Sequence, residues 1–306
     1  MTNITVEEID NTFDDLMVVN AARVSFGKWH DSFDTQKDSK LIDYLVKNNH
    51  WSPCAHPHTT VSIETGLLDP FELIQHKNLL AGLHFYNKSD DTTEVTGSLW
   101  GLLNLAKHIG DYSLFSICSN NAPVTSEAFE KYIGKVTGHN SYTKIVNPSN
   151  DSHEIYSMRI SAPIFVARQL VKHKEGTVWN EISRRYVDTD LEFLDIDEIR
   201  EKADNKKQGS SETIINPLVC YGVRTQPLPA TEAIKLHFEN TQKLYNQLLE
   251  THVCPEQARA IQPVASMTQW IWTMTQESME RVIDLRGDSH SQKETSIVST
   301  KMKEML

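Results

Sequence analysis

The sequence has few cysteines and no close pair of them. Its 4 cysteines are scattered over 306 residues, and no C-x-x-C pair occurs. Such spacing argues against a disulfide framework and against a zinc site built from thiolates. We therefore expect the thiols to be reduced.

Long apolar segments are also lacking. No run approaches the roughly 18 residues that a membrane-spanning helix needs. The first stretch, "MTNITVEEIDNTFDDL", is acidic and has no basic segment followed by an apolar one, unlike a signal or transit peptide. These absences predict a cytoplasmic protein with no membrane partner.

Positive charge is scarce in the chain as a whole. Lys and Arg number 30 against 41 Asp and Glu, which gives a formal net charge of -11. Because broad nucleic-acid binding needs an extended basic face, we expect no nucleic-acid partner. A small anionic ligand held by a local basic cluster remains compatible with this charge.

One segment nevertheless concentrates positive charge. "KHKEGTVWNEISRRYV", residues 172–187, holds four Lys or Arg side chains. The helix before it is expected to end near Lys174. Gln169, Lys172 and His173 are then spaced i, i+3 and i+4, so their side chains share one helix face.

Beyond Gly176 the chain is expected to extend as a strand. Glu181, Ser183 and Arg185 then alternate along it and project to one side. These groups, with those of the helix end, suit a planar phosphorylated ligand, because Arg binds phosphate through two parallel hydrogen bonds. The alternative is a solvated charged face, which is the usual meaning of a charge cluster.

Hydrophobic periodicity and turn residues outline the other elements. A polar linker is predicted at 87–97 and a polar loop at 201–214. Strands are predicted at 59–63 and 267–275, where Trp270 and Trp272 are expected in the core. Helices are predicted at 14–26, 38–49, 70–84, 97–109, 126–136, 164–174, 231–250, 255–261 and 277–286, before a last helix capped by Asp288 or Ser289.

Four blocks of sequence stand out together. They are "NAARVSFGK", "HWSPCAHP", "APIFVARQLVKHKEGTVWNEISRRYV" and "PEQARAIQPVASMTQWIWTMT", the last continuing to "RVIDLRGDSHSQKE". In content and order they resemble the flavin-dependent thymidylate synthase family. They cover most of residues 15–66 and 157–294 and leave an insertion at about 67–155, which is expected to be helical.

The family's signature departs from its usual form here. Arg-His-Arg, seven residues and Ser become Lys172-His173-Lys174, eight residues and Ser183. The charge is kept, but forked guanidinium groups are replaced by point charges, which reshapes contacts to phosphate or flavin.

The resemblance implies a single α/β (α+β) domain with a central mixed sheet flanked by helices. It also implies reductive methylation of dUMP to dTMP, with FAD as cofactor and with NADPH and methylenetetrahydrofolate as co-substrates. The family's sites lie between subunits of a homotetramer. Since the cofactor and folate carry the hard chemistry, positioning and charge are left to the protein.

The resemblance also assigns residues to the site, without a metal. The expected catalytic residues are Arg286, Ser183 and His173. The residues expected around dUMP are Gln169, Lys172, Glu181, Ser183, Arg185, Arg259 and Arg286, with Arg185 and Arg259 toward the phosphate and Arg286 toward the uracil edge. The residues expected around FAD are Ser25, His50, Ser52, His173, Lys174, Asn180, Glu181 and His290.

Other chemistries start from other residues. Cys54 in "SPCAH" offers the nucleophile of a classical thymidylate synthase, although it fits better as a small apolar loop residue. His50, His56 and His58 are spaced closely enough to share a metal ion, but no H-E-x-x-H motif accompanies them. His290 is alternatively a simple helix cap.

Two further possibilities remain open at this point. The cations of 172–187 with Trp179 and Tyr186 could serve a nonenzymatic nucleic-acid module. Within the enzyme class, a related pyrimidine nucleotide such as dCMP, or transfer of hydroxymethyl rather than methyl, would need few changes at the site.

Overall fold

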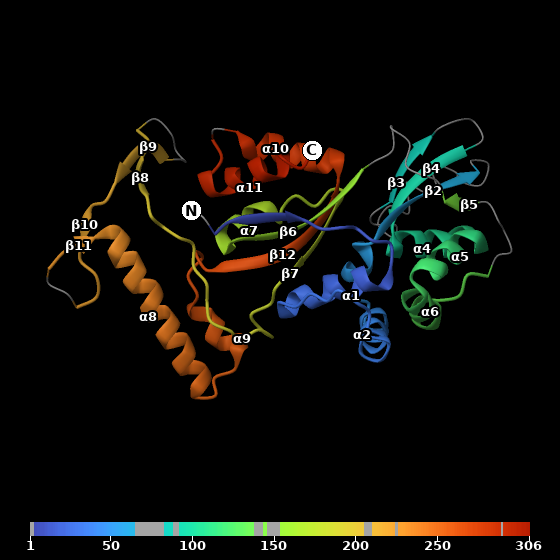
Figure 1. Ribbon diagram of the computed structural model, residues 1–306, viewed down its shortest axis with the longest axis horizontal. Helices are drawn as coiled ribbons and strands as arrows, with labels where there is room; N and C mark the ends of the chain where they lie inside the picture. Colours follow the sequence, from blue (N-terminus) through green and yellow to red (C-terminus); the bar gives the residue numbers. More distant parts are fainter. Residues whose placement is uncertain are drawn as a thin grey trace.

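The computed structural model describes residues 3–64, 83–87, 92–137, 143–145, 154–204, 210–223, 226–288 and 290–306. At its centre lies a four-stranded sheet in the order β1-β6-β12-β7, here called the central sheet (Figure 1). Its strands are β1 (Thr5–Glu8), β6 (Ile155–Pro163), β7 (Thr177–Glu181) and β12 (Met267–Thr275). The expected class, a central sheet flanked by helices, is confirmed, but every strand pair in this sheet is antiparallel, where a mixed sheet was expected.

Strand β12 sets the two faces of the central sheet, because successive side chains point to opposite sides. Trp270 and Trp272 are fully buried in a core with Met279 and Val298, as predicted from the sequence. Ile271 points the other way. It packs with Met17 and other residues of the first helix.

Helices cover both faces (Figure 1). The tryptophan face carries α7 (Ile164–Leu170), α10 (Gln276–Gly287) and α11 (Lys293–Lys303). The opposite face carries α1 (Asp15–Arg23), followed by the short 3-10 helices η1 (Val24–Phe26) and, after α2 (Thr35–Lys47), η2 (Ser52–Ala55). The helices predicted at 14–26, 38–49 and 277–286 are confirmed.

Three indole rings meet within the tryptophan face. Trp179 of β7 stacks on Trp270, with ring centroids 4.4 Å apart and planes 18° apart. It also meets Trp272 edge to face at 5.3 Å. Such offset and perpendicular arrangements are the favoured geometries of aromatic pairs.

The region predicted to be a helical insertion also contains strands. The helices predicted at 97–109 and 126–136 are confirmed, as α4 (Leu99–Ile109) and α6 (Pro123–Tyr132), and α5 (Tyr112–Asn121) lies between them. A second sheet, in the order β3-β4-β2-β5, consists of β2 (His58–Glu64), β3 (Leu83–Asn87), β4 (Thr92–Ser98) and β5 (Thr143–Ile145).

Strand β4 corrects the linker predicted at 87–97. Its threonines looked polar in the sequence, but Thr93 and Thr96 are buried and the strand pairs with β2 and β3. Most of the helix predicted at 70–84 lies outside the described residues, and its last two positions belong to β3.

Helix α6 is tied directly to α1. The Asp15 carboxylate accepts hydrogen bonds from the backbone N–H groups of Val124 and Thr125, at 2.9 Å each, and from the Thr125 hydroxyl at 2.6 Å. Burial raises the pKa of Asp15, against the lowering effect of these hydrogen bonds. The region predicted as an insertion, which contains α4, α5 and α6, thus shares one hydrophobic core with α1 rather than forming a separate body.

The remaining elements form an arm on the other side of the central sheet (Figure 1). They are the hairpin of β8 (Ile199–Lys202) and β9 (Ser210–Ile215), the pair β10 (Leu218–Val219) and β11 (Leu228–Pro229), α8 (Ala230–Glu250), α9 (Pro255–Ala258) and the 3-10 helix η4 (Arg259–Ile261). The helix predicted at 231–250 is confirmed, whereas the loop predicted at 201–214 is partly a hairpin. Within the described residues, no helix is long and apolar enough to cross a membrane.

Candidate functional site

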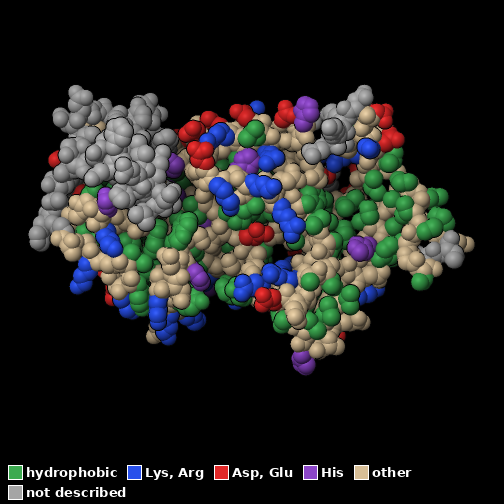
Figure 2. Space-filling model, turned by 180° about the vertical axis from the view of Figure 1, so that it is seen from behind, with side chains coloured by type: hydrophobic (Ala, Val, Ile, Leu, Met, Phe, Trp, Pro, Cys, Tyr) green, Lys and Arg blue, Asp and Glu red, His purple; other side chains and the backbone are tan. Residues whose placement is uncertain are grey.

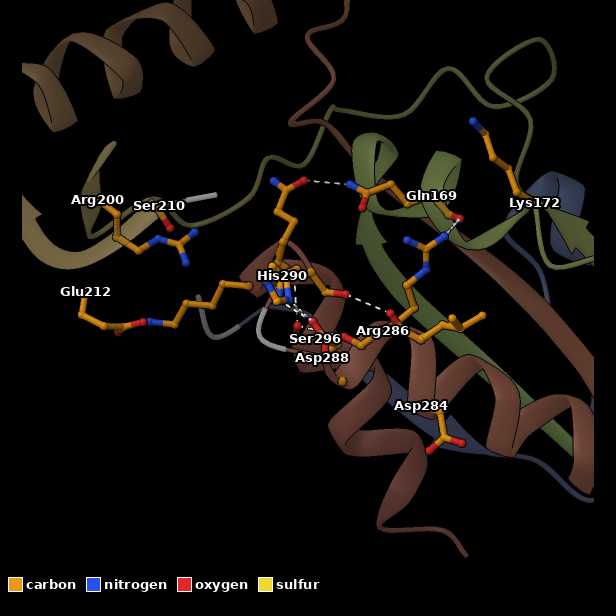
Figure 3. Close-up of a pocket in the computed structure, with 15 residues that line it drawn as sticks. Gln169, Lys172, Arg200, Ser210, Glu212, Asp284, Arg286, Asp288, His290 and Ser296 are labelled. Atoms are coloured by element: carbon orange, nitrogen blue, oxygen red, sulfur yellow. Dashed lines mark hydrogen bonds and ion pairs between the residues drawn. The ribbon is translucent and has the colours of Figure 1, made fainter. Parts of the chain in front are cut away.

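A broad cleft of about 1170 Å³ opens between the end of α7, the junction of α10 with α11, and the β8–β9 hairpin. Figure 3 shows Gln169, Lys172 and Arg286 on one side of it, with Arg200 of the hairpin on the other. His290 also lines it. Four residues expected at the site from sequence therefore share one cavity.

Arg286 is held in the cleft by two anchors. Its Nε–H donates to Nε2 of His173 at 3.0 Å, and its Nη2 donates to the backbone oxygen of Gln169 at 3.1 Å. Because His173 Nε2 accepts this bond, it carries no proton, and the ring is neutral. Burial, aided by the positive charges of Arg286 and Arg281, lowers the pKa of His173 in agreement with that state.

The helix before the basic segment ends earlier than predicted. Helix α7 stops at Leu170, so Gln169, Lys172 and His173 do not share a helix face. Gln169 and Lys172 nevertheless line the cleft, and His173 is joined to it through its hydrogen bond with Arg286. Lys174 is exposed and does not line the cleft.

Gly176 fixes that turn. Its φ of +63° is the left-handed conformation that favours glycine, and a Cβ there would overlap Ser278 Oγ. The Ser278 hydroxyl donates to the backbone oxygen of Glu175 at 2.8 Å, and Arg281 pairs with the Glu175 carboxylate at 2.8 Å. Helix α10 therefore holds both the loop and, through Arg286, the histidine on it.

Gln169 has partners on the next helix. Its Nε2 donates to Gln292 Oε1 at 2.7 Å, and its Oε1 accepts from Thr295 Oγ1 at 3.2 Å. Gln292 is the N-cap residue of α11, without a side-chain cap bond. The cap predicted at Asp288 is wrong, because Asp288 instead accepts from His290 Nδ1 at 2.6 Å, and Ser289 lies outside the described residues.

Glu181, the last residue of β7, is fully engaged as an acceptor. Its Oε1 accepts from Thr268 Oγ1 at 2.7 Å, and its Oε2 accepts from Trp179 Nε1 at 3.2 Å. These two bonds hold the Glu181 side chain in place at the end of the strand.

The strand predicted through Ser183 and Arg185 ends too early for them to alternate along it. After Glu181 the chain forms a turn in which the backbone oxygen of Ser183 accepts from Tyr186 N at 2.9 Å. Arg185 lies over the Tyr186 ring, 5.3 Å from its centroid, with its Nε 4.0 Å from Glu256.

Residues expected near flavin gather on the opposite face of the central sheet. Asn180 pairs with Ile271 of β12, so its side chain points to that face, and its Oδ1 lies 3.3 Å from His56 Nε2. Ser25 donates to the backbone oxygen of Glu181 at 3.1 Å. Ser52 begins η2, whereas His50 is exposed beside Tyr44.

The expected residues thus divide into separate groups. The cleft brings together Gln169, Lys172, Arg286 and His290, with His173 behind Arg286. Arg259 begins η4 and does not line the cleft. A single chain does not gather all of these residues around one ligand.

The cleft also contains residues that the sequence did not single out. Arg200 of β8 donates to Glu294 Oε1 at 2.7 Å, and both side chains are largely buried. Lys293 lies in the matched segment "SQKE", but Arg200 lies directly before the loop predicted at 201–214 and gave no signal. Ser296 holds the end of α10 by donating to the backbone oxygen of Arg286 at 2.9 Å.

The alternative chemistries find little support in this arrangement. The Cys54 thiol is buried, and burial raises its pKa to about 12, so a reactive thiolate is disfavoured. Burial lowers the pKa of His56 to about 3 and that of His58 to about 4. Over the described ranges, no group of three or more His, Cys, Asp or Glu residues is arranged to hold a metal ion.

The cleft residues fit a nucleotide and a flavin by the chemistry of their donors. Lys172, Arg200, Arg286 and Lys293 suit phosphate oxygens, and the amides of Gln169 and Gln292 suit ring edges. Glu212, Asp284 and Asp288 also line the cleft. The cations lie in one cavity instead of covering a surface.

The sequence of the chain is similar to that of known proteins. The sequence model of the Thy1 family, described as thymidylate synthase complementing protein, matches residues 9–78 and 112–306. A flavin-dependent thymidylate synthase of Aquifex aeolicus (strain VF5) is 27% identical over 320 residues, 95% of this chain and 94% of that protein. Another, of Thermosipho africanus (strain TCF52B), is 35% identical over 140 residues, 46% of this chain and 58% of that protein.

Among solved structures, the chain is similar to the UMP/dUMP methylase PolB from Streptomyces cacaoi bound with 5-Br dUMP. The sequence identity is 18% and the TM-score 0.40, over 100% of this chain and 90% of that one. A TM-score of this size carries no argument, so the family match rests on sequence.

Proposed function

Because the chain belongs to the Thy1 family, we propose that it is a flavin-dependent thymidylate synthase that converts dUMP to dTMP. FAD is the proposed cofactor, methylenetetrahydrofolate the carbon donor and NADPH the reductant. The same residues would accept a related pyrimidine nucleotide such as dCMP with few changes, so dUMP is the preferred and not the sole candidate substrate.

The observation that carries this proposal is that two hydrogen bonds fix the Arg286 side chain. With one edge bonded to His173 and to the backbone of Gln169, the guanidinium is fixed while it borders the cleft. A fixed cation at a uracil edge would stabilise negative charge on the carbonyl oxygens of the ring, and this polarisation makes C5 a better nucleophile toward the methylene carbon. Because it is already in place, little reorganisation accompanies the reaction.

Other residues bind and orient the nucleotide. Lys172 and Gln169 border the cleft beside Arg286. Arg185 and Arg259 lie at the turn after β7 and on η4, and they are assigned to the phosphate. Ser183 is assigned a hydrogen bond to the nucleotide rather than the role of a nucleophile, because the Glu181 carboxylate is bonded to Thr268 and Trp179 instead of to the Ser183 hydroxyl.

The residues assigned to the flavin are His173, Lys174 and His290 near the cleft, and Ser25, His50, Ser52 and Asn180 on the other face of the sheet. Reduced flavin supplies the hydride that completes the methyl group. The protein's task is to hold the partners in contact and exclude water.

We also propose a homotetramer with sites between subunits. Because the two groups of flavin residues lie on opposite faces of one sheet, a second copy is needed to bring both to one cofactor. The arm offers an apolar surface for assembly: Ile214, Leu218, Val223 and Leu244 are exposed. Figure 2 shows hydrophobic side chains gathered over this end of the molecule, with Lys and Arg nearer the middle.

The test is spectroscopic and chemical. The purified protein, with FAD added, is expected to absorb at about 450 nm, a wavelength set by the flavin. With dUMP, methylenetetrahydrofolate and NADPH, mass analysis should find dTMP, and Cys54→Ala should retain this activity. A protein that takes up no flavin contradicts the proposal, as does a product of different mass.

A further inference from the structure

A chain of hydrogen-bonded polar side chains leads to Asn180 on the face of the central sheet away from the tryptophans. It consists of Asn11, Ser157, Thr273 and His56, and it ends at the Asn180 amide. Ser157, Thr273 and His56 are buried, so their hydrogen bonds have no competition from water. Each proton in such a chain constrains the next.

The direction of the chain is set at Asn11 by backbone groups. Asn11 Oδ1 accepts from the backbone N–H of His58 at 3.0 Å, and Asn11 Nδ2 donates to the backbone oxygen of His56 at 2.8 Å. A backbone N–H only donates and a carbonyl only accepts, so the Asn11 amide cannot be reversed. Its second Nδ2 proton goes to Ser157 Oγ, at 2.6 Å.

The remaining bonds follow from that start. Ser157 Oγ accepts from Asn11, and Thr273 Oγ1, at 2.7 Å, is its one further partner among the described residues, so an acceptor for the Ser157 proton is found only there. The Thr273 proton goes to His56 Nδ1 at 2.8 Å. The His56 ring then carries its proton on Nε2 and donates it to Asn180 Oδ1 at 3.3 Å. Burial lowers the pKa of His56 to about 3, which is consistent with the neutral ring this order requires.

The hydrogen bond from His56 therefore fixes the orientation of the Asn180 amide. Its oxygen is engaged by His56, and its NH₂ has no acceptor among the residues that the structure describes. Asn180 is only partly buried, so a ligand can reach this group.

We propose that His56 is a positioning residue that fixes Asn180 as a hydrogen-bond donor. The matching ligand atom is an acceptor on a heteroaromatic ring, either a carbonyl oxygen or an unprotonated nitrogen. The identification of that ring as flavin rests on the proposed function. The direction of the hydrogen bonds does not.

The first test measures the His56 tautomer in the wild-type protein without ligand. ¹⁵N chemical shifts of the imidazole at neutral pH are expected to show Nε2 protonated and Nδ1 unprotonated. The opposite tautomer, or a charged ring, overturns the proposal whatever the protein binds. This measurement therefore separates the proposal from the assignment of flavin.

The second test compares two variants in FAD titrations. Asn180→Ala removes the donor and should weaken FAD binding by about tenfold, the effect of one lost hydrogen bond. Asn180→Asp has nearly the same shape but presents an acceptor, so it should bind FAD more weakly than Asn180→Ala. Tighter binding by Asn180→Asp means that the oxygen faces the ligand and overturns the proposal. If the wild type binds no FAD, the proposed function fails, and the tautomer still tests the hydrogen-bond chain.

A third comparison separates positioning from general support of the fold. Thr273→Val keeps the shape of the side chain but removes the hydroxyl between Ser157 and His56. It should weaken FAD binding in the wild-type background, Thr273→Ser should restore it, and Thr273→Val should have no further effect beside Asn180→Ala. An equal loss in both backgrounds shows that Thr273 acts independently of Asn180 and contradicts the proposal.

Discussion

The two faces of the central sheet hold their polar groups by different means. On the face of Asn180, strand pairing and a chain of buried hydrogen bonds fix each group, and the partners are themselves buried. On the other side, the cleft residues lie at helix ends and on a turn. There, Lys172 and His290 remain exposed at the edge of a cavity of about 1170 Å³.

The difference suggests a division of labour. A group on a paired strand has one position, which suits recognition of a single ring atom. Exposed cations on loops adapt to phosphates in several positions, at the cost of ordering their side chains. Arg286 is the exception in the cleft, because two bonds hold it.

The largest effect is expected when Arg286, the cleft residue held by two hydrogen bonds from its guanidinium, is replaced. Arg286→Gln should lower the rate of dTMP formation by about 10²- to 10³-fold, the usual cost of losing a preorganised group that stabilises developing charge. Single-turnover oxidation of reduced flavin measures the step. The matched control is Arg159→Gln, which breaks an exposed pair with Glu7 away from the cleft and should change little. An active Arg286→Gln enzyme contradicts the role given to the guanidinium.

The turn that carries His173 gives the next largest effect. Gly176→Ala combines a left-handed φ with an overlap at Ser278 Oγ and should cost about 2–4 kcal/mol in unfolding free energy. Gly222 has a φ of +65°, and no atom of the described residues lies within 4 Å of a Cβ placed there, so Gly222→Ala should cost only the backbone strain, about 1 kcal/mol. Urea unfolding compares the two. Equal losses would show that contact with α10 does not matter.

Acid should distinguish the two faces. Burial lowers the pKa of His56 from its ordinary value of 6.5 to about 3 in the folded state, so below about pH 6.5 the unfolded chain binds more protons and the folded state loses stability. The loss from His56 alone is about 2 kcal/mol at about pH 5. The pKa of His173, on the cleft side, is also lowered, so acid destabilises the folded state through this residue too, by a smaller amount. The free energy of unfolding, measured at neutral and at acidic pH, should fall less on acidification in His56→Gln than in His173→Gln.

The smallest effect is expected at Ser183. Ser183→Ala should weaken dUMP binding by about 1.5 kcal/mol, one charge-assisted hydrogen bond, and leave dTMP formation measurable at saturating dUMP. Titration with dUMP followed by product analysis gives both values. A folded, nucleotide-saturated variant that forms no dTMP would make Ser183 a covalent catalyst.

Strongly patterned elements were predictable from the sequence. Strand β12 matches its predicted range because it is a short run of almost entirely buried residues rich in aromatic, β-branched and other apolar side chains, which favours a strand. The hairpin of β8 and β9 was not predictable, because its residues are polar and much of it is exposed. Strand β4 failed for a related reason, since its buried threonines look like loop residues.

The resemblance named the site residues, but it did not reveal their contacts. The end of α7 depends on the docking of Gly176 against Ser278, about a hundred positions further along the chain. The bond between Arg286 and His173 spans 113 positions, and local spacing says nothing about such a pair. Arg200 was missed because its pairing with Glu294 joins a hairpin to a helix.

The close packing of three indoles in the central sheet has an optical consequence. Chromophores this close, and held rigidly, couple their electronic transitions, so Trp179, Trp270 and Trp272 act together as one chiral absorber. Near-ultraviolet circular dichroism depends on such fixed packing and vanishes when the packing is lost. Half of the chain's 6 tryptophans therefore report on the central sheet alone. Because Trp179 adjoins Asn180 and Glu181, that signal also senses the strand that carries both.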